Sequence, residues 1–268
     1  MATNELSFAG LYQRVGIGTG LLHRVCPSRD QCWEGLGGPG QGDKWNRVSN
    51  PWIGAHYDRW RVLACGINLY QYGGTSALKK VVGNAKKYLR DGRSRVSPEE
   101  GRGGSLIFHR AAAYSALVLR EMRHPSLLDI GPEDVSPARV AEALDSVAFV
   151  NYVKCSPAHL VSAFSQPTAE MVENCGRLVF NEELSLLSPK VVLMLGDPIF
   201  RAFASLSGAT VLRRSGGVII YDFPAEGKKT LLIGLPHPSR AGSRRSLFEE
   251  LERGLRLDGI QRRLRAGA

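Results

Sequence analysis

The sequence contains no long apolar run and little cysteine. No stretch approaches the roughly 20 apolar residues that a membrane-spanning helix needs, so no membrane protein is expected. The N-terminus lacks a basic segment followed by an apolar core, which argues against a secretory signal. The 268 residues include five cysteines. Without a signal peptide these indicate thiols or metal ligands in a reducing cytoplasm rather than a disulfide framework. We therefore expect a cytoplasmic protein.

Acidic residues are too few to balance the basic ones. The chain has 25 Asp and Glu against 35 Lys and Arg, a net charge of +10, and its isoelectric point is near 9.6. Such a charge favours an acidic partner, most simply nucleic acid. A basic surface that meets only solvent would give the same composition, so charge alone leaves both interpretations open.

Neither an internal repeat nor a clear linker interrupts the chain, which predicts one domain over residues 1–268. Segments with helical patterns separate four short apolar runs that predict buried strands, at about 61–66, 147–153, 191–196 and 230–233. Strands that alternate with helices predict an α/β fold, with three α/β/α layers around a central, mostly parallel four-stranded sheet. A segment with weak periodicity, 1–60, precedes the first strand, and we expect a short helix before Cys26 and irregular chain after it. A basic tail, 256–268, is expected to fray.

Polar residues follow two of these strands. Asn68 comes after the run that ends at Gly66, and His237 stands between two prolines after the last run. Glycine allows a turn or a close approach to a ligand, and open α/β sheets bind ligands at the carboxyl ends of their strands. The pattern predicts a cleft that contains Asn68 and His237. Both also have an ordinary interpretation, as a turn-forming Asn and as a loop histidine that caps a helix.

Four motifs occur in a characteristic order along the chain: Gly66-Ile67-Asn68, Phe149-Val150-Asn151-Tyr152-Val153-Lys154-Cys155, Pro167-Thr168 through Cys175 and on to Leu195-Gly196, and His237-Pro238-Ser239. From about Cys26 to Leu255 the chain thereby resembles the uracil-DNA glycosylase superfamily, and within it the branch that carries an iron–sulfur cluster. The resemblance implies a monomeric enzyme with DNA as its partner and no obligate protein partner. Its reaction would be hydrolysis of the N-glycosidic bond of uracil or a related pyrimidine flipped out of DNA.

Three departures from the branch concern the pocket or its rim. Cys26 and Cys32 are separated by five residues, where the branch usually has two. Ile67-Asn68-Leu69-Tyr70 stands where the branch usually has Glu-Ala-Pro-Gly, and the segment between Tyr70 and Leu106 is long. These departures concern the identity of the base more than the type of reaction.

The resemblance implies two catalytic roles and a set of base contacts. Asn68 would hold a water through its carbonyl oxygen, because an amide takes up no proton at neutral pH. His237 would donate a hydrogen bond to O2 of the departing base. The residues expected to contact the base are Gly66, Ile67, Tyr70, Phe108 and Asn151. Of these, Phe108 could instead be an ordinary core residue.

The same resemblance implies a four-thiolate site made by Cys26, Cys32, Cys155 and Cys175. Thiolates suit a [4Fe–4S] cluster or zinc. Their spacing does not decide between the two, and four unrelated buried thiols are a further alternative. We expect the cluster, in a structural role. DNA contacts are expected from the residues that follow His237, namely Ser239, Arg240, Arg244 and Arg245.

Three functions compete on this evidence. The first is the uracil-type glycosylase. The second is a glycosylase that removes a bulky modified base from foreign or phage DNA as antiviral defence, which the altered first motif suggests. The third, from another class, is a nucleic-acid-binding protein that keeps the fold without catalysis. Asn68 and His237 together favour an enzyme.

Overall fold

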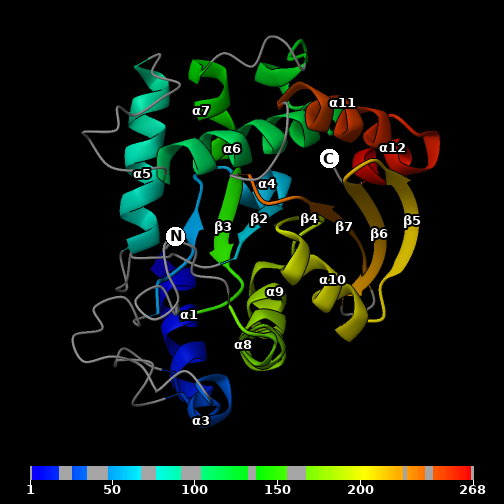
Figure 1. The fold of residues 1–268 in the computed structure, drawn as a ribbon. Helices are drawn as coiled ribbons and strands as arrows, with labels where there is room; N and C mark the ends of the chain where they lie inside the picture. The colour runs from blue at the N-terminus through cyan, green and yellow to red at the C-terminus, as the bar shows by residue number, and fades with distance from the viewer. Residues whose placement is uncertain are drawn as a thin grey trace. The chain divides into compact units, whose positions relative to one another are not determined.

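The computed structural model describes residues 2–17, 26–34, 48–67, 77–91, 104–131, 137–155, 167–225, 228–238 and 244–266 (Figure 1). Its chain forms two compact units. The first unit comprises Met1–Pro51, Gly66–Lys79 and Val150–Ser188, and the second comprises Trp52–Cys65, Lys80–Phe149 and Pro189–Ala268. Among the described helices, none is both long enough and apolar enough to cross a membrane.

The first unit is built mainly from helices: α1 (Ala2–Arg14), α3 (Arg29–Cys32), α8 (Ala169–Cys175), η2 (Gly176–Phe180) and α9 (Asn181–Leu187). The helices of the second unit are α4 (Tyr57–Trp60), most of α5 (Ala77–Arg90), α6 (Gly104–Glu121), η1 (Pro125–Leu127), α7 (Pro137–Asp145), α10 (Asp197–Leu206), α11 (Arg244–Leu255) and α12 (Asp258–Arg265). The strands are β1 (Trp52–Ile53), β2 (Val62–Gly66), β3 (Val147–Asn151), β4 (Val191–Leu195), β5 (Thr210–Ser215), β6 (Val218–Ala225) and β7 (Lys228–Leu235). The last residues of β2 and β3 belong to the first unit.

The sheet has seven strands in the order β1-β3-β2-β4-β7-β6-β5, so the prediction of four was wrong in number. The four predicted strands are β2, β3, β4 and β7, and they lie next to one another in the sheet. β4 pairs in parallel with β2 and with β7, while β1 and the β5–β6–β7 meander are antiparallel additions at the edges. β2 and β4 are buried along nearly their whole length, as expected for strands covered on both faces.

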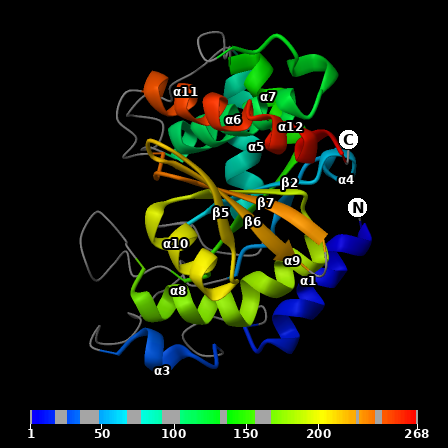
Figure 2. The ribbon, with the colours of Figure 1, turned by 90° about the vertical axis from the view of Figure 1, so that its right-hand side faces the viewer.

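Helices cover both faces of the sheet in the second unit. A Cβ atom at Gly234 in β7 would lie 2.6 Å from the ring of Phe200, so α10 packs directly on that face. Ile219 is the residue paired with Gly234, and its neighbour Ile220 therefore points to the opposite face. There, a Cβ atom at Gly254 of α11 would lie 3.1 Å from Ile220. Figure 2 shows α10 and α11 on opposite sides of β6 and β7, which confirms the predicted α/β/α layers.

A long helical stretch in the first unit begins at Ala169. The side chain of Thr168 caps α8 by accepting a hydrogen bond from the backbone N–H of Met171 at 3.2 Å. The stretch then passes through the π-helical turns of η2, directly after Cys175, and continues as α9 to Leu187. Short π-helical insertions in α-helices often occur at functional sites.

The basic tail does not fray as predicted but forms α12. Ile260 and Leu264 are buried, and Arg263 pairs with Asp222 of β6 at 2.8 Å. Ile260 and Leu264 are four residues apart and therefore lie on one face of the helix. The prediction of fraying considered the charge of the tail and not this apolar face.

Candidate functional site

Two of the predicted base contacts meet where neighbouring strands end. Gly66 is the last residue of β2, and Asn151 is the last residue of β3. A Cβ atom at Gly66 would lie 3.1 Å from Oδ1 of Asn151, so only a glycine leaves this amide undisturbed. The backbone continues the pairing beyond the strands, because the N–H of Tyr152 donates to O of Gly66 at 2.9 Å and that of Val153 donates to O of Ile67 at 2.8 Å. The structure thus brings Gly66, Ile67 and Asn151 together.

A buried ion pair holds the backbone on the carboxyl side of β3. Nζ of Lys154 donates to the carbonyl oxygen of Asn151 and to Oε2 of Glu183, the latter at 2.6 Å. The hydroxyl of Tyr12 donates to Oε1 of Glu183 at 2.6 Å. Burial and the negative charge of Glu183 both raise the pKa of Tyr12, so it stays a neutral donor. One carboxylate therefore links α1, α9 and the segment that carries Asn151.

The sequence analysis did not identify Lys154, Glu183 or Tyr12. A signal for Glu183 was present, because it lies on the buried face of α9 with Leu184 and Leu187, just after the buried Phe180 of η2. A carboxylate on an apolar helix face requires a buried partner. The partner itself could not be identified from spacing, since Tyr12 is 171 residues away in the chain.

The four predicted thiol ligands line one pocket in the first unit. Cys26 and Cys32 reach it from α3 and the residues before it, Cys155 from the segment after β3, and Cys175 from the end of α8. The pocket wall is largely apolar, with Ile17, Trp33, Leu178 and Val179. Nδ2 of Asn174 donates to Sγ of Cys32 at 3.5 Å. Segments that are far apart in the sequence thus supply sulfur atoms to a common cavity.

Burial in this pocket raises the pKa of all four thiols. The pKa of Cys175 rises to about 12, although the nearby Lys154 lowers it in part. The pKa of Cys26, Cys32 and Cys155 also rises, and that of Cys155 rises further because the other three thiols would carry like charge. Such thiols stay protonated at neutral pH unless a cation compensates them. Within the described residues, no three His, Cys, Asp or Glu side chains have the arrangement of a metal site, so the pocket offers donors without a finished coordination geometry.

His237 belongs to the second unit. It is half-buried and follows β7, after Leu235 and Pro236. The described residues do not include Asn68, Tyr70, Ser239 or Arg240. Phe108 lies in α6, and Arg244 and Arg245 begin α11, but the description does not extend to their side chains. The predicted roles of these seven residues remain predictions.

Comparison with protein families gives one match. The family model described as the uracil DNA glycosylase superfamily matches residues 115–256, which is more than half of the chain. Among curated proteins, none matches. The matched range contains Asn151, Cys155, Cys175 and His237. Gly66, Cys26 and Cys32 precede it, as do the departures in the first motif.

Proposed function

Because the chain belongs to the uracil DNA glycosylase superfamily, we propose that it hydrolyses the N-glycosidic bond of uracil, or of a related pyrimidine, flipped out of DNA. Membership supports glycosylase activity on DNA in general, and the choice of base is our proposal. The products would be the free base and an abasic site. The observation that carries this choice is the amide of Asn151, held against Gly66 at the ends of adjacent strands.

The amide of Asn151 matches the hydrogen-bonding edge of uracil. Oδ1 can accept from N3–H of the base while Nδ2 donates to O4. Cytosine presents the opposite pattern at these atoms, so discrimination requires a fixed amide. Support for a fixed amide comes from Gly66, where an added Cβ atom would lie 3.1 Å from Oδ1, and from Lys154, which donates to the carbonyl oxygen of Asn151.

In the proposed reaction, His237 acts on the charge that develops as the glycosidic bond breaks. Electrons move onto the departing pyrimidine, and a hydrogen bond from His237 to its O2 would stabilise that negative charge. A preorganised donor of this kind contributes about 3–4 kcal/mol in comparable oxyanion sites. Asn68 would hold the attacking water by its carbonyl oxygen. Flipping the nucleotide costs a few kcal/mol before any chemistry, which binding to the DNA backbone must offset.

A panel of DNA duplexes tests the choice of base. Each duplex carries one altered base, and abasic sites are detected after incubation with purified protein. We expect cleavage at uracil, and we expect N151D to change which base is removed, because the substitution replaces the amide donor by an acceptor. Failure to produce abasic sites from any duplex would favour the non-catalytic DNA-binding function.

A second candidate substrate is a bulkier modified pyrimidine in foreign DNA, with a role in antiviral defence. Support comes from the altered first motif at Ile67-Asn68-Leu69-Tyr70 and from a family match that begins only at residue 115. The same panel separates the two candidates when it includes a glycosylated pyrimidine. Preference for that base over uracil would favour the defence role.

We also propose that Cys26, Cys32, Cys155 and Cys175 hold an iron–sulfur cluster, with zinc as the alternative. Support comes from the four thiols on one apolar pocket and from their chemistry as soft donors. When bound, the cluster would supply a structural link and no step of the hydrolysis. It would tie α3 to the segment that carries Asn151.

Metal analysis of the purified protein tests this assignment. We expect a brown protein that contains iron and acid-labile sulfide, and we expect C155S or C175S to lower solubility more than the rate of base release. Cys65 is a matched control, because it is buried in β2 outside the pocket, so C65S should leave the iron content unchanged. Zinc alone, or no metal at all, would contradict the cluster.

A further inference from the structure

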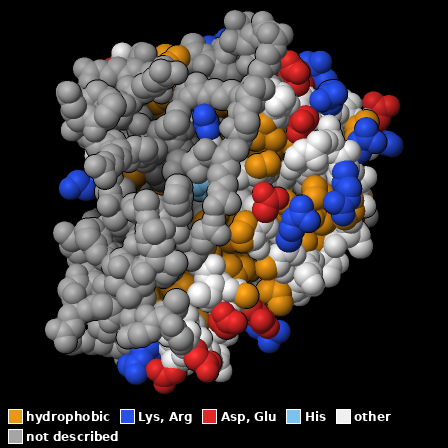
Figure 3. All heavy atoms as spheres, in the orientation of Figure 1, with side chains coloured by type: hydrophobic (Ala, Val, Ile, Leu, Met, Phe, Trp, Pro, Cys, Tyr) orange, Lys and Arg blue, Asp and Glu red, His pale blue; other side chains and the backbone are white. Residues whose placement is uncertain are grey.

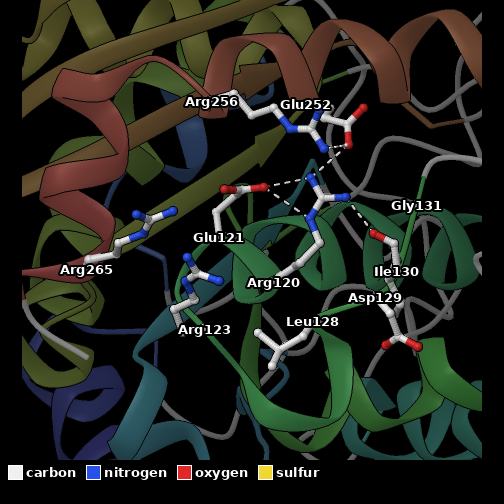
Figure 4. A pocket seen from close by; sticks show the side chains of 10 residues that line it. All are labelled: Arg120, Glu121, Arg123, Leu128, Asp129, Ile130, Gly131, Glu252, Arg256 and Arg265. Carbon is white, nitrogen blue, oxygen red and sulfur yellow. Dashed lines mark hydrogen bonds and ion pairs between the residues drawn. The ribbon is translucent and has the colours of Figure 1, made fainter.

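The second unit contains an open pocket of about 530 Å³ that the proposed reaction does not use. It is formed by the end of α6, the turn after it, and the helices α11 and α12 (Figure 4). Arg123 belongs to its wall, and the next residue, His124, has its ring 4.6 Å from that of Trp60, which precedes β2. The pocket therefore lies toward the amino end of β2, whereas His237 follows the carboxyl end of the parallel strand β7.

Each carboxylate of this pocket already has a cationic partner. The buried guanidinium of Arg120 contacts Glu121 at 2.7 Å and Glu252 at 2.9 Å, and Arg256 contacts Glu252 at 2.8 Å. Asp129 accepts a hydrogen bond from Arg139, outside the pocket, at 2.9 Å. Two arginines and two glutamates thus balance, and Asp129 is neutralised from outside.

Two further arginines line the pocket without such compensation. Arg123 and Arg265 are exposed, and among the described residues neither has a carboxylate within salt-bridge distance. Figure 4 shows their guanidinium groups on the same side of the pocket. Arg123 follows the end of α6, and Arg265 ends α12, so packing of distant segments creates this pair of positive charges.

The backbone at Arg123 is unfavourable for any residue with a side chain. Its φ is 67°, in the left-handed region. Its N–H donates to O of Arg120, and the N–H of His124 donates to O of Leu119. These two bonds form the helix-ending motif whose left-handed position is usually glycine. An arginine here lowers stability relative to glycine, and residues in such strained conformations cluster at functional sites.

We propose that this pocket binds a nucleoside monophosphate, with the phosphate on Arg123 and Arg265. Guanidinium groups suit a phosphomonoester because they donate paired hydrogen bonds and stay charged. An apolar wall stands beside them, since Leu128 lines the pocket and this residue is 49% exposed. That wall can cover the sugar or the base. The phosphomonoester is carried either by a free nucleotide or by the 5′-phosphorylated end of a DNA strand.

Calorimetric titration of the full chain with dAMP tests the site. Adenine presents a donor at N6 and an acceptor at N1, the reverse of the uracil pattern that the proposed function assigns to Asn151, so dAMP reports on this pocket separately from the proposed active site. We expect dAMP to bind, and deoxyadenosine and inorganic phosphate to bind at least tenfold more weakly. R123G and R265Q should each weaken dAMP binding at least tenfold. R253Q is the matched control, because Arg253 is exposed on α11 outside the pocket, and it should bind dAMP like the wild type.

Two further measurements complete the test. R123G should unfold at the same temperature as the wild type or higher, which separates lost binding from lost folding, and it should release base at the wild-type rate. Binding of a 5′-phosphorylated oligonucleotide and of its 5′-hydroxyl form is compared between the wild type and R123G. If R123G weakens only the binding of the 5′-phosphorylated form, a strand end is the source of the phosphate. Absence of dAMP binding, or binding that both variants leave unchanged, would overturn the proposal. Equal binding of inorganic phosphate would overturn the nucleotide assignment.

Discussion

The missing side chain at Gly66 leaves room for the amide of Asn151. A Cβ atom at this position would lie 3.1 Å from Oδ1, closer than an ordinary van der Waals contact, so the amide would have to shift by a few tenths of an ångström. Misplaced recognition groups can be costly, since positioning contributes much of an enzyme's rate. We expect G66A to lower kcat/KM for base release by roughly tenfold or more, measured under single-turnover and steady-state conditions.

Gly83 provides the matched control for this substitution. It lies in α5, and a Cβ atom there would meet nothing within 4 Å. Alanine in place of a helical glycine should stabilise the protein by about 1 kcal/mol and leave the rate of base release unchanged. A G66A protein as active as G83A would show that the position of the Asn151 amide does not matter for the reaction.

The base contacts that the structure brings together could be predicted because they lie at the ends of strands. Gly66 and Asn151 are recognisable because each ends an apolar run, and parallel neighbouring strands bring such ends together. Lys154 and Glu183 are not recognisable in this way, because the partner of a buried charge is set by tertiary packing. The pair formed by Arg123 and Arg265 could not be predicted from the sequence either. Their lack of a carboxylate partner among the described residues depends on which carboxylates Arg120 and Arg139 contact in the folded chain.

At the level of secondary-structure elements, Glu183 joins three segments of the first unit. It accepts hydrogen bonds from Tyr12 in α1 and from Lys154 after β3. The side chains of Lys154 and Glu183 are 6% and 0% exposed, so removal of one charge leaves the other buried without compensation. We expect E183Q to lower the free energy of unfolding by about 3–5 kcal/mol, measured by urea denaturation.

A surface pair on the same helical stretch controls for charge loss alone. Glu173 and Arg177 contact each other at 2.7 Å, but both side chains are more than half exposed. Because surface pairs contribute about 0–1 kcal/mol, E173Q should change stability little. If E183Q were no less stable than E173Q, the buried carboxylate would not hold these segments together.

The elements themselves could be predicted in proportion to their apolar patterning. The four buried strands have strong signals, and the structure confirms them. Strand β5 was missed because its residues are almost all exposed and include Arg213 and Arg214. It forms by pairing with β6, a tertiary effect that no local pattern in the strand reveals.

At the level of the whole molecule, the net charge of +10 predicts how the protein meets DNA. Figure 3 is in the orientation of Figure 1, and it shows Lys and Arg side chains where Figure 1 places β5, β6 and α12. Contacts between such side chains and phosphates release counterions, so affinity falls linearly with salt on logarithmic axes. We expect affinity for a duplex to fall at least roughly tenfold between 50 and 200 mM salt.

Fluorescence anisotropy with a labelled duplex measures this dependence. The double variant R213Q/R214Q removes two exposed charges from β5 and should reduce the salt slope if these arginines contact phosphates, by up to about 2. Affinity that stays flat across the salt range would show that the positive charge is a solvated surface without a role in DNA binding.

Release of free uracil from a duplex under single-turnover conditions is the most direct test of the proposed glycosylase. The wild type should release the base and leave an abasic site. H237A should do so more slowly by roughly 10²–10³, and N68A should also lose activity because the water is no longer held. Neither variant should bind an abasic duplex much more weakly, since both residues act on charge and geometry that arise only in the transition state. A double variant of Asn68 and His237 that releases uracil at the wild-type rate would contradict this account.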